Sequence, residues 1–358
     1  MKALVTKQLN RRIGSPSVNA QKLTPLEPGA SIEIVKIVTG DKVDGNNAWY
    51  QTSEGYYVWC GGCNKIFQPP NPIIEIIQED SLFTNPNFMI NYNEIIKNIP
   101  DAWKLTGGKG INIAVLDTGV NATHIDFNGI FNQSNTIDFT SSPSGIEDVY
   151  NHGTLVSGII GARTLLNSGI RGVVPESNLF ILKVGDDNGV FLPTNIINAI
   201  NWASSNKIDI LNMSFGINYN YYRSIITTLN NIQNSIIVSS AGEDDILIQS
   251  NFLYPAMHPQ IISVGAIKQP INGVFNKALN YILPLIPMTS CDGANQNTYK
   301  TESGSSMSTA LLTGVIALYL SYSGKSNLQK STIMQELDKY SIAYNNNIEL
   351  NDLYIIKP

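Results

Sequence analysis

The chain has 358 residues, of which 43% are hydrophobic and only 14% are charged, with a formal net charge of -5. This length and hydrophobic fraction allow two domains with a sizeable core. The low charge argues against nucleic acid as a partner, because no basic stripe is available to neutralise phosphates. Three cysteines, Cys60, Cys63 and Cys291, are too few for a disulfide framework.

The N-terminal stretch MKALVTKQLNRR does not have the apolar core of a signal peptide behind its charges. No window of the sequence approaches the roughly eighteen continuous apolar residues of a membrane span. We therefore expect no membrane partner and favour a cytoplasmic location, with secretion as the alternative if a signal has been removed.

Short β segments separated by turns fill residues 1–68. The segments are LNRRIGSPS, the alternating EPGASIEIVKIV, the turn DGNN, and AWYQTSEGYYVWCGG. From Leu9 to Gly62 this order of parts resembles the bacterial SH3-like barrel. The resemblance implies a small all-β domain that binds a peptide or the neighbouring domain and has no catalytic role.

Cys60 and Cys63 form a C-x-x-C pair at the exit of the last of these segments. No second cysteine pair or histidine pair follows at ligand spacing, which argues against a zinc site. Two alternatives remain open, a structural pair in a loop and a reversible disulfide. Residues 69–94 begin with the Pro-rich QPPNP, which predicts a linker or extended arm and places the domain boundary there.

Apolar strands alternate with helices in residues 95–358. A buried strand, INIAVLD, ends at Asp117, and further strands are expected at SNLFILKVGD, IDILNMSFG, NSIIVSSAGE and QIISVGAI. Helices are expected at PTNIINAINWASSN, RSIITTLNNIQ, the nearly all-apolar STALLTGVIALYLSYSG, and QKSTIMQELDKYS. This alternation predicts an α/β fold with a parallel sheet covered by helices on both faces.

Three motifs supply the residue types of a nucleophilic triad in the order Asp, His, Ser. Asp117 stands in AVLDTGV, His152 in NHGTLVSG, and Ser306 in GSSMSTA at the start of the apolar helix. A serine hydroxyl is a weak nucleophile until a base takes its proton, and an imidazole oriented by a carboxylate can do so near neutral pH. Taken singly, each residue can also be explained as a turn or helix cap.

Seven blocks in order resemble the subtilisin-like serine proteases: DTGVNATHID, HGTLVSG, GVVP, LNMSFG, SSAGE, YPA and GSSMSTA. The resemblance implies a subtilisin-type fold and an endopeptidase that works through an acyl-enzyme. It also implies that Ser306 is the nucleophile, His152 the general base and acid, and Asp117 the group that orients the imidazole.

The same resemblance implies that a peptide substrate lies as an added strand beside the first specificity pocket. The implied contacts are Ser214, Phe215 and Gly216 on one side and Ser240, Ala241 and Gly242 on the other. The position of Phe215 at the rim suggests that neighbouring subsites accept apolar side chains.

Glu243 departs from the family pattern, which has an asparagine here that donates one of two oxyanion hydrogen bonds. An ionised carboxylate cannot donate, and losing such a donor costs about 10²–10³ in rate. A protonated carboxyl could donate, and the charges of Asp244 and Asp245 favour that form. Three interpretations stay open: a protease favoured at lower pH, a slow and selective protease, and a peptide-binding, regulatory pseudoprotease.

No cofactor is required by this chemistry, although the resemblance allows for calcium. Asp126 matches a ligand position and Asn167 loosely resembles another, but a hard cation needs about six oxygens. His124 and His258 are expected to be surface or packing residues. Relatives carry an inhibitory prodomain where this chain has the barrel and the arm at 69–79, so the arm is a candidate intramolecular lid.

Overall fold

The chain folds into two compact units, a small N-terminal unit and a larger one. The computed structural model describes residues 2–66, 99–164, 169–248, 253–324, 329–339, 341–343 and 356–357. The linker and lid predicted within residues 69–94 lie outside the described residues, so both stay predictions.

The N-terminal unit is a seven-stranded antiparallel sheet in the order β3-β2-β6-β5-β4-β1-β7. The strands are β1 (Lys2–Val5), β2 (Leu9–Ile13), β3 (Gln21–Leu26), β4 (Ser31–Val43), β5 (Asn46–Thr52), β6 (Tyr56–Trp59) and β7 (Cys63–Ile66). Asp44 and Gly45 join β4 to β5, and both have positive φ (47° and 85°), as a two-residue type I′ hairpin requires. The predicted all-β unit is confirmed, whereas its SH3-like identity and its partner stay predictions.

Cys60 begins the short helix η1 (Cys60–Gly62) and Cys63 follows it, and both are thiols in this structure. Asn46 Nδ2 donates a hydrogen bond to Cys60 Sγ (3.4 Å). Burial, with a smaller effect of Cys60, raises the pKa of Cys63 to about 11. A thiol with this pKa stays protonated near neutral pH, which favours the structural alternative over a reactive pair.

The larger unit is built on a nine-stranded sheet in the order β17-β18-β14-β13-β12-β11-β8-β10-β9. The strands are β8 (Asn112–Asp117), β9 (Thr136–Asp138), β10 (Asn178–Lys183), β11 (Ile210–Met213), β12 (Ile236–Glu243), β13 (Ile261–Ile267), β14 (Tyr281–Pro284), β17 (Ile342–Ala343) and β18 (Ile356–Lys357). Neighbouring strands from β9 to β14 pair in parallel, and β18 runs antiparallel to β14. A separate hairpin consists of β15 (Met288–Cys291) and β16 (Tyr299–Glu302).

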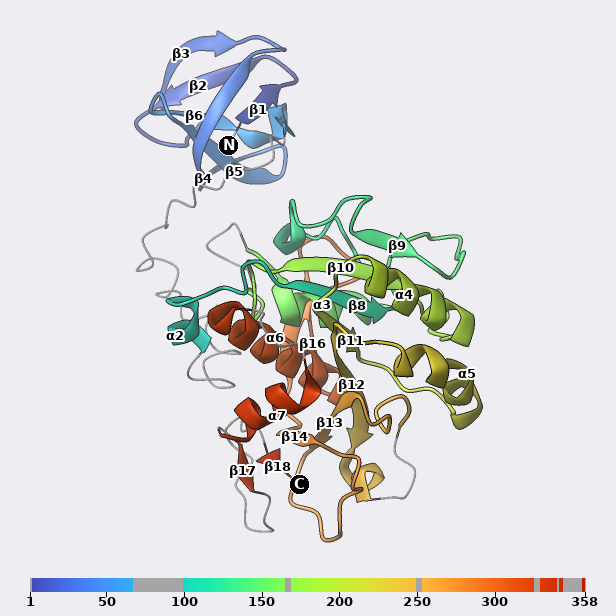
Figure 1. The fold of residues 1–358 in the computed structure, drawn as a ribbon. Helices are drawn as coiled ribbons and strands as arrows, with labels where there is room; N and C mark the ends of the chain where they lie inside the picture. The colour runs from blue at the N-terminus through green and yellow to red at the C-terminus, as the bar shows by residue number, and fades with distance from the viewer. Residues whose placement is uncertain are drawn as a thin grey trace. The chain divides into compact units, whose positions relative to one another are not determined.

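Helices cover both faces of this sheet, as the sequence predicts. They are α2 (Ile99–Trp103), α3 (Gly153–Gly161), α4 (Pro193–Ser205), α5 (Tyr219–Asn230), α6 (Ser305–Ser323) and α7 (Lys330–Asp338). Figure 1 shows α3 and α6 on one face and α4 and α5 on the other. Alternation along β8 feeds both layers, because Ile113 and Val115 join the core with α3 and α6, while Ala114 and Leu116 join the core with α4 and α5.

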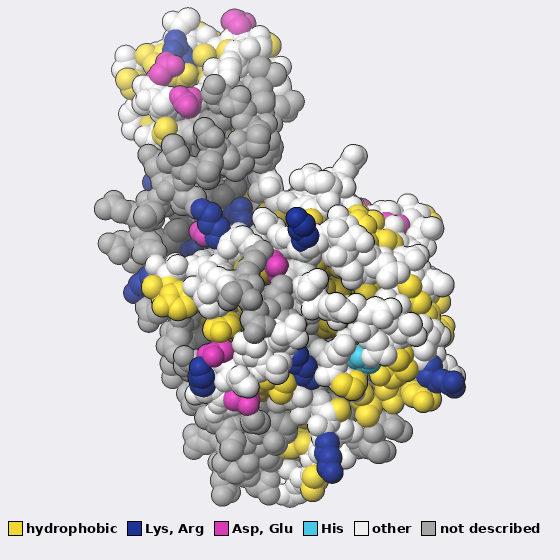
Figure 2. Space-filling view, viewed as in Figure 1, with side chains coloured by type: hydrophobic (Ala, Val, Ile, Leu, Met, Phe, Trp, Pro, Cys, Tyr) yellow, Lys and Arg dark blue, Asp and Glu magenta, His cyan; other side chains and the backbone are white. Residues whose placement is uncertain are grey.

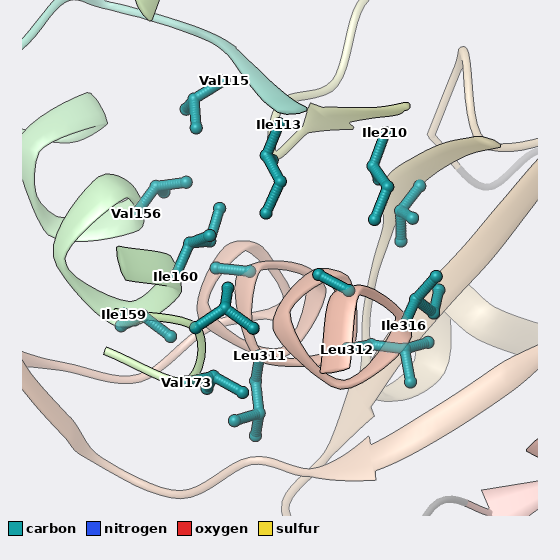
Figure 3. Packing of buried hydrophobic residues seen from close by; sticks show 14 of the residues in the cluster. Ile113, Val115, Val156, Ile159, Ile160, Val173, Ile210, Leu311, Leu312 and Ile316 are labelled. Carbon is teal, nitrogen blue, oxygen red and sulfur yellow. The ribbon is translucent and has the colours of Figure 1, made fainter. Parts of the chain in front are cut away.

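Helix α6 runs through the core and carries the predicted nucleophile at its first turn. Leu311, Leu312 and Ile316 project into the buried cluster (Figure 3), and Gly324 ends the helix with a positive φ of 74°. By length and composition α6 could cross a membrane, but 72% of its apolar window is buried inside the fold. That burial is typical of a core helix.

The described surface carries few charges, in agreement with the composition. Figure 2 shows basic and acidic side chains scattered singly over this face, while hydrophobic side chains gather toward the side where Figure 1 places α5. Tyr219, the first residue of α5, is 54% exposed.

Candidate active site

Asp117 lies at the carboxyl end of β8, where parallel sheets place reactive groups, and it is fully buried. Its Oδ1 accepts hydrogen bonds from His152 Nδ1 (2.7 Å) and from the amide of Thr118 (2.7 Å). A buried carboxylate with these donors holds the imidazole in one tautomer and orientation, with Nε2 left for a substrate-side proton.

His152 immediately precedes α3, and its side chain is 23% exposed. Burial opposes protonation of the ring, but the charge and hydrogen bond of Asp117 outweigh burial and raise the pKa of His152. The site therefore stabilises the imidazolium that forms when the ring accepts a proton.

Ser306 is the second residue of α6 and is partly exposed. Its Oγ donates to the carbonyl oxygen of Ser214 (2.7 Å), and Ser214 Oγ donates to the Ser306 carbonyl oxygen (2.9 Å). Among the described residues the Ser306 hydroxyl donates to Ser214 and makes no hydrogen bond to His152.

Asp148 is a buried carboxylate beside His152 that sequence reasoning missed. Its Oδ1 accepts from the Thr118 hydroxyl (2.7 Å), and its Oδ2 accepts from both the amide and the hydroxyl of Thr154 (2.7 Å each). These bonds satisfy the first turn of α3, and the negative charge also helps to raise the pKa of His152. Asp148 stands four residues before the N-cap residue His152, outside the position at which a sequence shows a capping signal.

Lys183 is a second residue that sequence reasoning missed, and it lies fully buried opposite Asp117 in the β8/β10 ladder. Its ammonium donates to the carbonyl oxygens of Thr118 (2.9 Å) and Glu147 (2.7 Å) and to Asp187 Oδ1 (3.0 Å). A buried charge needs such partners. Here the ammonium holds the backbone at Thr118, just after Asp117, and at Glu147, which precedes His152. The sequence feature that could have identified Lys183 is a single lysine within an apolar strand.

Glu243, the last residue of β12, contacts the N-terminus of α6. Its Oε1 accepts a hydrogen bond from the amide of Ser305 (2.8 Å), the residue before Ser306. A Cβ placed on Gly304 would lie 3.2 Å from the same oxygen. The carboxyl oxygen therefore acts here as an acceptor at the positive end of the helix dipole.

The predicted substrate segment Ser214 to Gly216 follows β11 and lies beside Ser306 through the Ser214 contacts described above. Phe215 is only 6% exposed, and its ring stacks on Phe191 with 4.3 Å between centroids. The expectation that Phe215 stands at an open rim was wrong, because the Phe191 ring covers it.

The second predicted segment, residues 240–242, lies on the other side of the same helix start. Ser240 Oγ donates to Ser305 Oγ (2.7 Å), and both Ser240 and Ala241 are buried. Gly242 has a φ of +100°, which a side chain would strain. The buried side chains of Ser240 and Ala241 thus support one wall of the predicted specificity pocket. Because Gly242 has no side chain, the backbone there can approach a ligand.

Asp126 is buried, and its Oδ2 accepts from the amide of Ile170 (2.8 Å). Ligating atoms of Asp126, His124 and Cys291 lie within 4.8 Å of one another. Burial raises the pKa of Cys291 well above its usual value, and His124 Nδ1 already accepts the Asp126 amide (3.2 Å). A thiol and an occupied imidazole suit calcium poorly, and Asn167 lies outside the described residues.

His124 and His258 are both buried packing residues. The His124 ring meets Tyr299 edge-on at 5.4 Å, and His258 Nε2 lies 3.1 Å from Asn230 Oδ1. Within the described residues, neither histidine makes a hydrogen bond to Asp117 or His152.

Comparisons with known proteins identify the family of this chain. Residues 108–348 match the Subtilase family. The chain is 33% identical over 277 residues to the "Major intracellular serine protease" of Bacillus subtilis (strain 168), covering 71% of this chain and 84% of the relative. It is 30% identical over 290 residues to the "Thermophilic serine proteinase" of Bacillus sp. (strain AK1), covering 76% and 69%.

A solved structure described as a cold adapted subtilisin-like serine proteinase shares the fold. It has a TM-score of 0.55 and 23% identity, and the match covers 70% of this chain and 89% of that one. The family match spans more than half of the chain and includes the segments around Asp117, His152 and Ser306. The chain belongs to the subtilase family of serine proteases.

Proposed function

We propose that this subtilase is an endopeptidase in which Ser306 attacks the peptide carbonyl, His152 transfers the proton and Asp117 orients the imidazole. The observation that carries the proposal is the 2.7 Å hydrogen bond from His152 Nδ1 to the fully buried Asp117, with Ser306 partly exposed in the first turn of α6. Such a pair leaves His152 Nε2 to act as the base.

The proposed reaction proceeds through an acyl-enzyme. Ser306 Oγ forms a bond to the carbonyl carbon while its proton passes to His152 Nε2, giving a tetrahedral intermediate. Its collapse breaks the C–N bond, and the imidazolium returns the proton to the leaving amine. Water, deprotonated by the same imidazole, then hydrolyses the ester and restores Ser306.

Glu243 is the atypical part of the proposed site. The amide of Ser305 donates to its carboxyl oxygen, so this group lies at the start of α6, where we propose that the oxyanion develops. An ionised Glu243 opposes that oxyanion, whereas a neutral one supplies an O–H donor. We therefore expect slow cleavage at neutral pH, with Glu243 as the residue that limits the rate.

A second candidate function is a peptide-binding pseudoprotease with a regulatory role, and the Glu243–Ser305 contact is what favours it. In that case the cleft binds an extended peptide without cutting it. Either way the proposed partner is a protein or peptide, because pairing with the backbone of the 214–216 segment recognises any extended chain. We propose no cofactor for this chemistry, and a cytoplasmic site of action agrees with the named intracellular relative.

The experiment is hydrolysis of a chromogenic peptide by the full chain, by Ser306→Ala and by Ser323→Ala. Ser323 ends the same helix and donates only to Tyr319 within the described structure (2.8 Å), so it is a matched control. We expect Ser306→Ala to remove activity and Ser323→Ala to retain it. Equal activity of Ser306→Ala and the parent would overturn the proposed nucleophile.

A further inference from the structure

Two glycines, Gly216 and Gly242, lie near residues that contact the start of α6. Gly216 follows Ser214, whose carbonyl oxygen accepts the Ser306 hydroxyl (2.7 Å). Gly242 precedes Glu243, which contacts the amide before Ser306 as described above. The gap between the two glycines therefore lies beside residues that contact the start of α6.

The side chain of Leu253 occupies this gap. A Cβ placed on Gly216 would lie 2.8 Å from Leu253 Cδ1, and a Cβ placed on Gly242 would lie 3.7 Å from the same methyl carbon. The first distance is well inside the 3.5–4.0 Å, approximately, at which carbon atoms make favourable contact. One methyl group of Leu253 thus packs against both glycines, and the absence of a side chain on Gly216 is what makes room for it.

The backbone around Leu253 is tied to both walls of the gap. The Leu253 amide donates to the Ala241 carbonyl oxygen (3.4 Å), on the Gly242 side. The next residue, Tyr254, accepts the amide of Ile217 (2.7 Å) in an isolated bridge on the Gly216 side. The side chain of Leu253 is 37% exposed, so it closes the gap while one part of it stays open to a ligand.

We propose that Leu253 makes the first specificity pocket shallow, so that this protease selects peptides with glycine, alanine or serine at the residue whose carbonyl carbon is attacked. The inference rests on the proposed function, because it takes Ser306 as the attacking group. A leucine or phenylalanine side chain entering between Gly216 and Gly242 meets the Leu253 methyl groups before it is buried. Exclusion of a few carbon atoms from such a pocket changes selectivity by about 10- to 100-fold.

Peptide binding to full-length Ser306→Ala tests this without requiring catalysis. Fluorescence anisotropy is measured for one extended peptide series that differs only in the residue under test, alanine against phenylalanine. We expect the alanine peptide to bind about 10- to 100-fold more tightly. Adding Leu253→Ala should cancel or reverse that ratio, whereas adding Leu253→Met, which conserves volume, should keep it.

Leu105→Ala is the matched control, since Leu105 is a leucine in an exposed loop on α2's C-terminal side. An alanine preference that Leu253→Ala removes and Leu105→Ala keeps supports the inference. Equal or tighter binding of the phenylalanine peptide before Leu253 is changed overturns it, as does a preference unaffected by Leu253→Ala. Loss of the proposed function is a separate result, because it is measured as absence of hydrolysis by the parent.

Discussion

The residues around Ser306 form an acid–base group and a substrate-side group. The two groups differ in how their polar atoms are hydrogen-bonded. On the acid–base side, His152 Nδ1 donates to Asp117 Oδ1 at 2.7 Å, and Asp148 accepts the Thr118 hydroxyl and the Thr154 amide at the same distance. On the substrate side, the carboxyl of Glu243 lies at a helix start that would otherwise stabilise an anion, and Leu253 fills the adjacent gap.

This contrast separates two requirements of catalysis. Proton transfer needs an oriented base, and the buried Asp117 orients the His152 ring here. Stabilising the oxyanion and accepting a substrate side chain need open donors and open space, and we propose that Glu243 restricts the first and Leu253 the second. We therefore expect a protease whose proton transfer is intact and whose rate and selectivity are limited on the substrate side.

The largest effect after loss of the nucleophile is expected from Asp117→Asn. The amide would hold His152 in the wrong tautomer, and the equivalent change in a serine protease triad lowers kcat by about 10⁴-fold. The measurement is kcat for a peptide amide, with circular dichroism to show that the fold is kept. A decrease in kcat of less than about tenfold would contradict this account, because His152 would then not depend on the buried carboxylate of Asp117.

A gain is expected from Glu243→Asn, which places an amide donor where the carboxylate lies. The neutral-pH rate should rise by about 10²–10³-fold, the contribution of one oxyanion donor. Glu243→Gln, which restores an amide donor on a longer side chain, should recover part of the gain.

Asp244→Asn is the control for charge alone, because Asp244 accepts the Lys268 amide (2.9 Å) and not the start of α6. If neither amide at position 243 changes the rate, the restriction does not lie at Glu243. If the parent is inactive at every pH and Glu243→Asn is active, the pseudoprotease describes the natural chain.

A smaller effect, about tenfold or less in rate at neutral pH, is expected from Asp148→Asn. Loss of its contacts to the first turn of α3 should cost roughly 1 kcal/mol of stability. Removing its charge should also lower the pKa of His152, so the acid limb of the rate profile should move to lower pH. An unmoved acid limb would leave Asp148 with a structural role only, and Asp138→Asn is a control at a carboxylate that binds Thr140 instead.

The raised pKa of His152 gives opposite pH trends for activity and stability. Activity should rise with pH through this pKa, because the base must be neutral. The stability that protonated His152 contributes should be fully present below about pH 6.5, the ordinary value, and should be lost as pH rises through the raised one. Thermal unfolding of the parent and of His152→Ala across pH checks the sign, and a stability difference that grows with pH would contradict it.

Much of the fold was predictable because its signals are local. The period of apolar residues placed β8, α4 and α6 close to their observed bounds, and motif order brought Asp117 and His152 together. Contacts between distant segments were not predictable in this way. Three such contacts depend on how loops pack. They are the stacking of Phe191 on Phe215, the hydrogen bonds of Asp148 to the first turn of α3, and the position of Leu253 between two glycines.

Glu243 shows the limit most clearly. The sequence showed that an acid stood where a donor is expected, but only the structure showed its oxygen accepting the Ser305 amide. A glutamate side chain has several rotatable bonds and can point toward or away from the start of α6. The residues next to it in sequence do not determine which of these orientations it adopts.

The central claim is that Ser306 is the nucleophile activated by the Asp117–His152 pair. Its most direct test is to react the full chain with a fluorophosphonate and to locate the adduct by mass spectrometry, with Asp117→Asn treated in parallel. We predict a single adduct on Ser306, formed far more slowly in Asp117→Asn. An adduct on another serine, or equal rates of Ser306 modification in the two proteins, would contradict the claim.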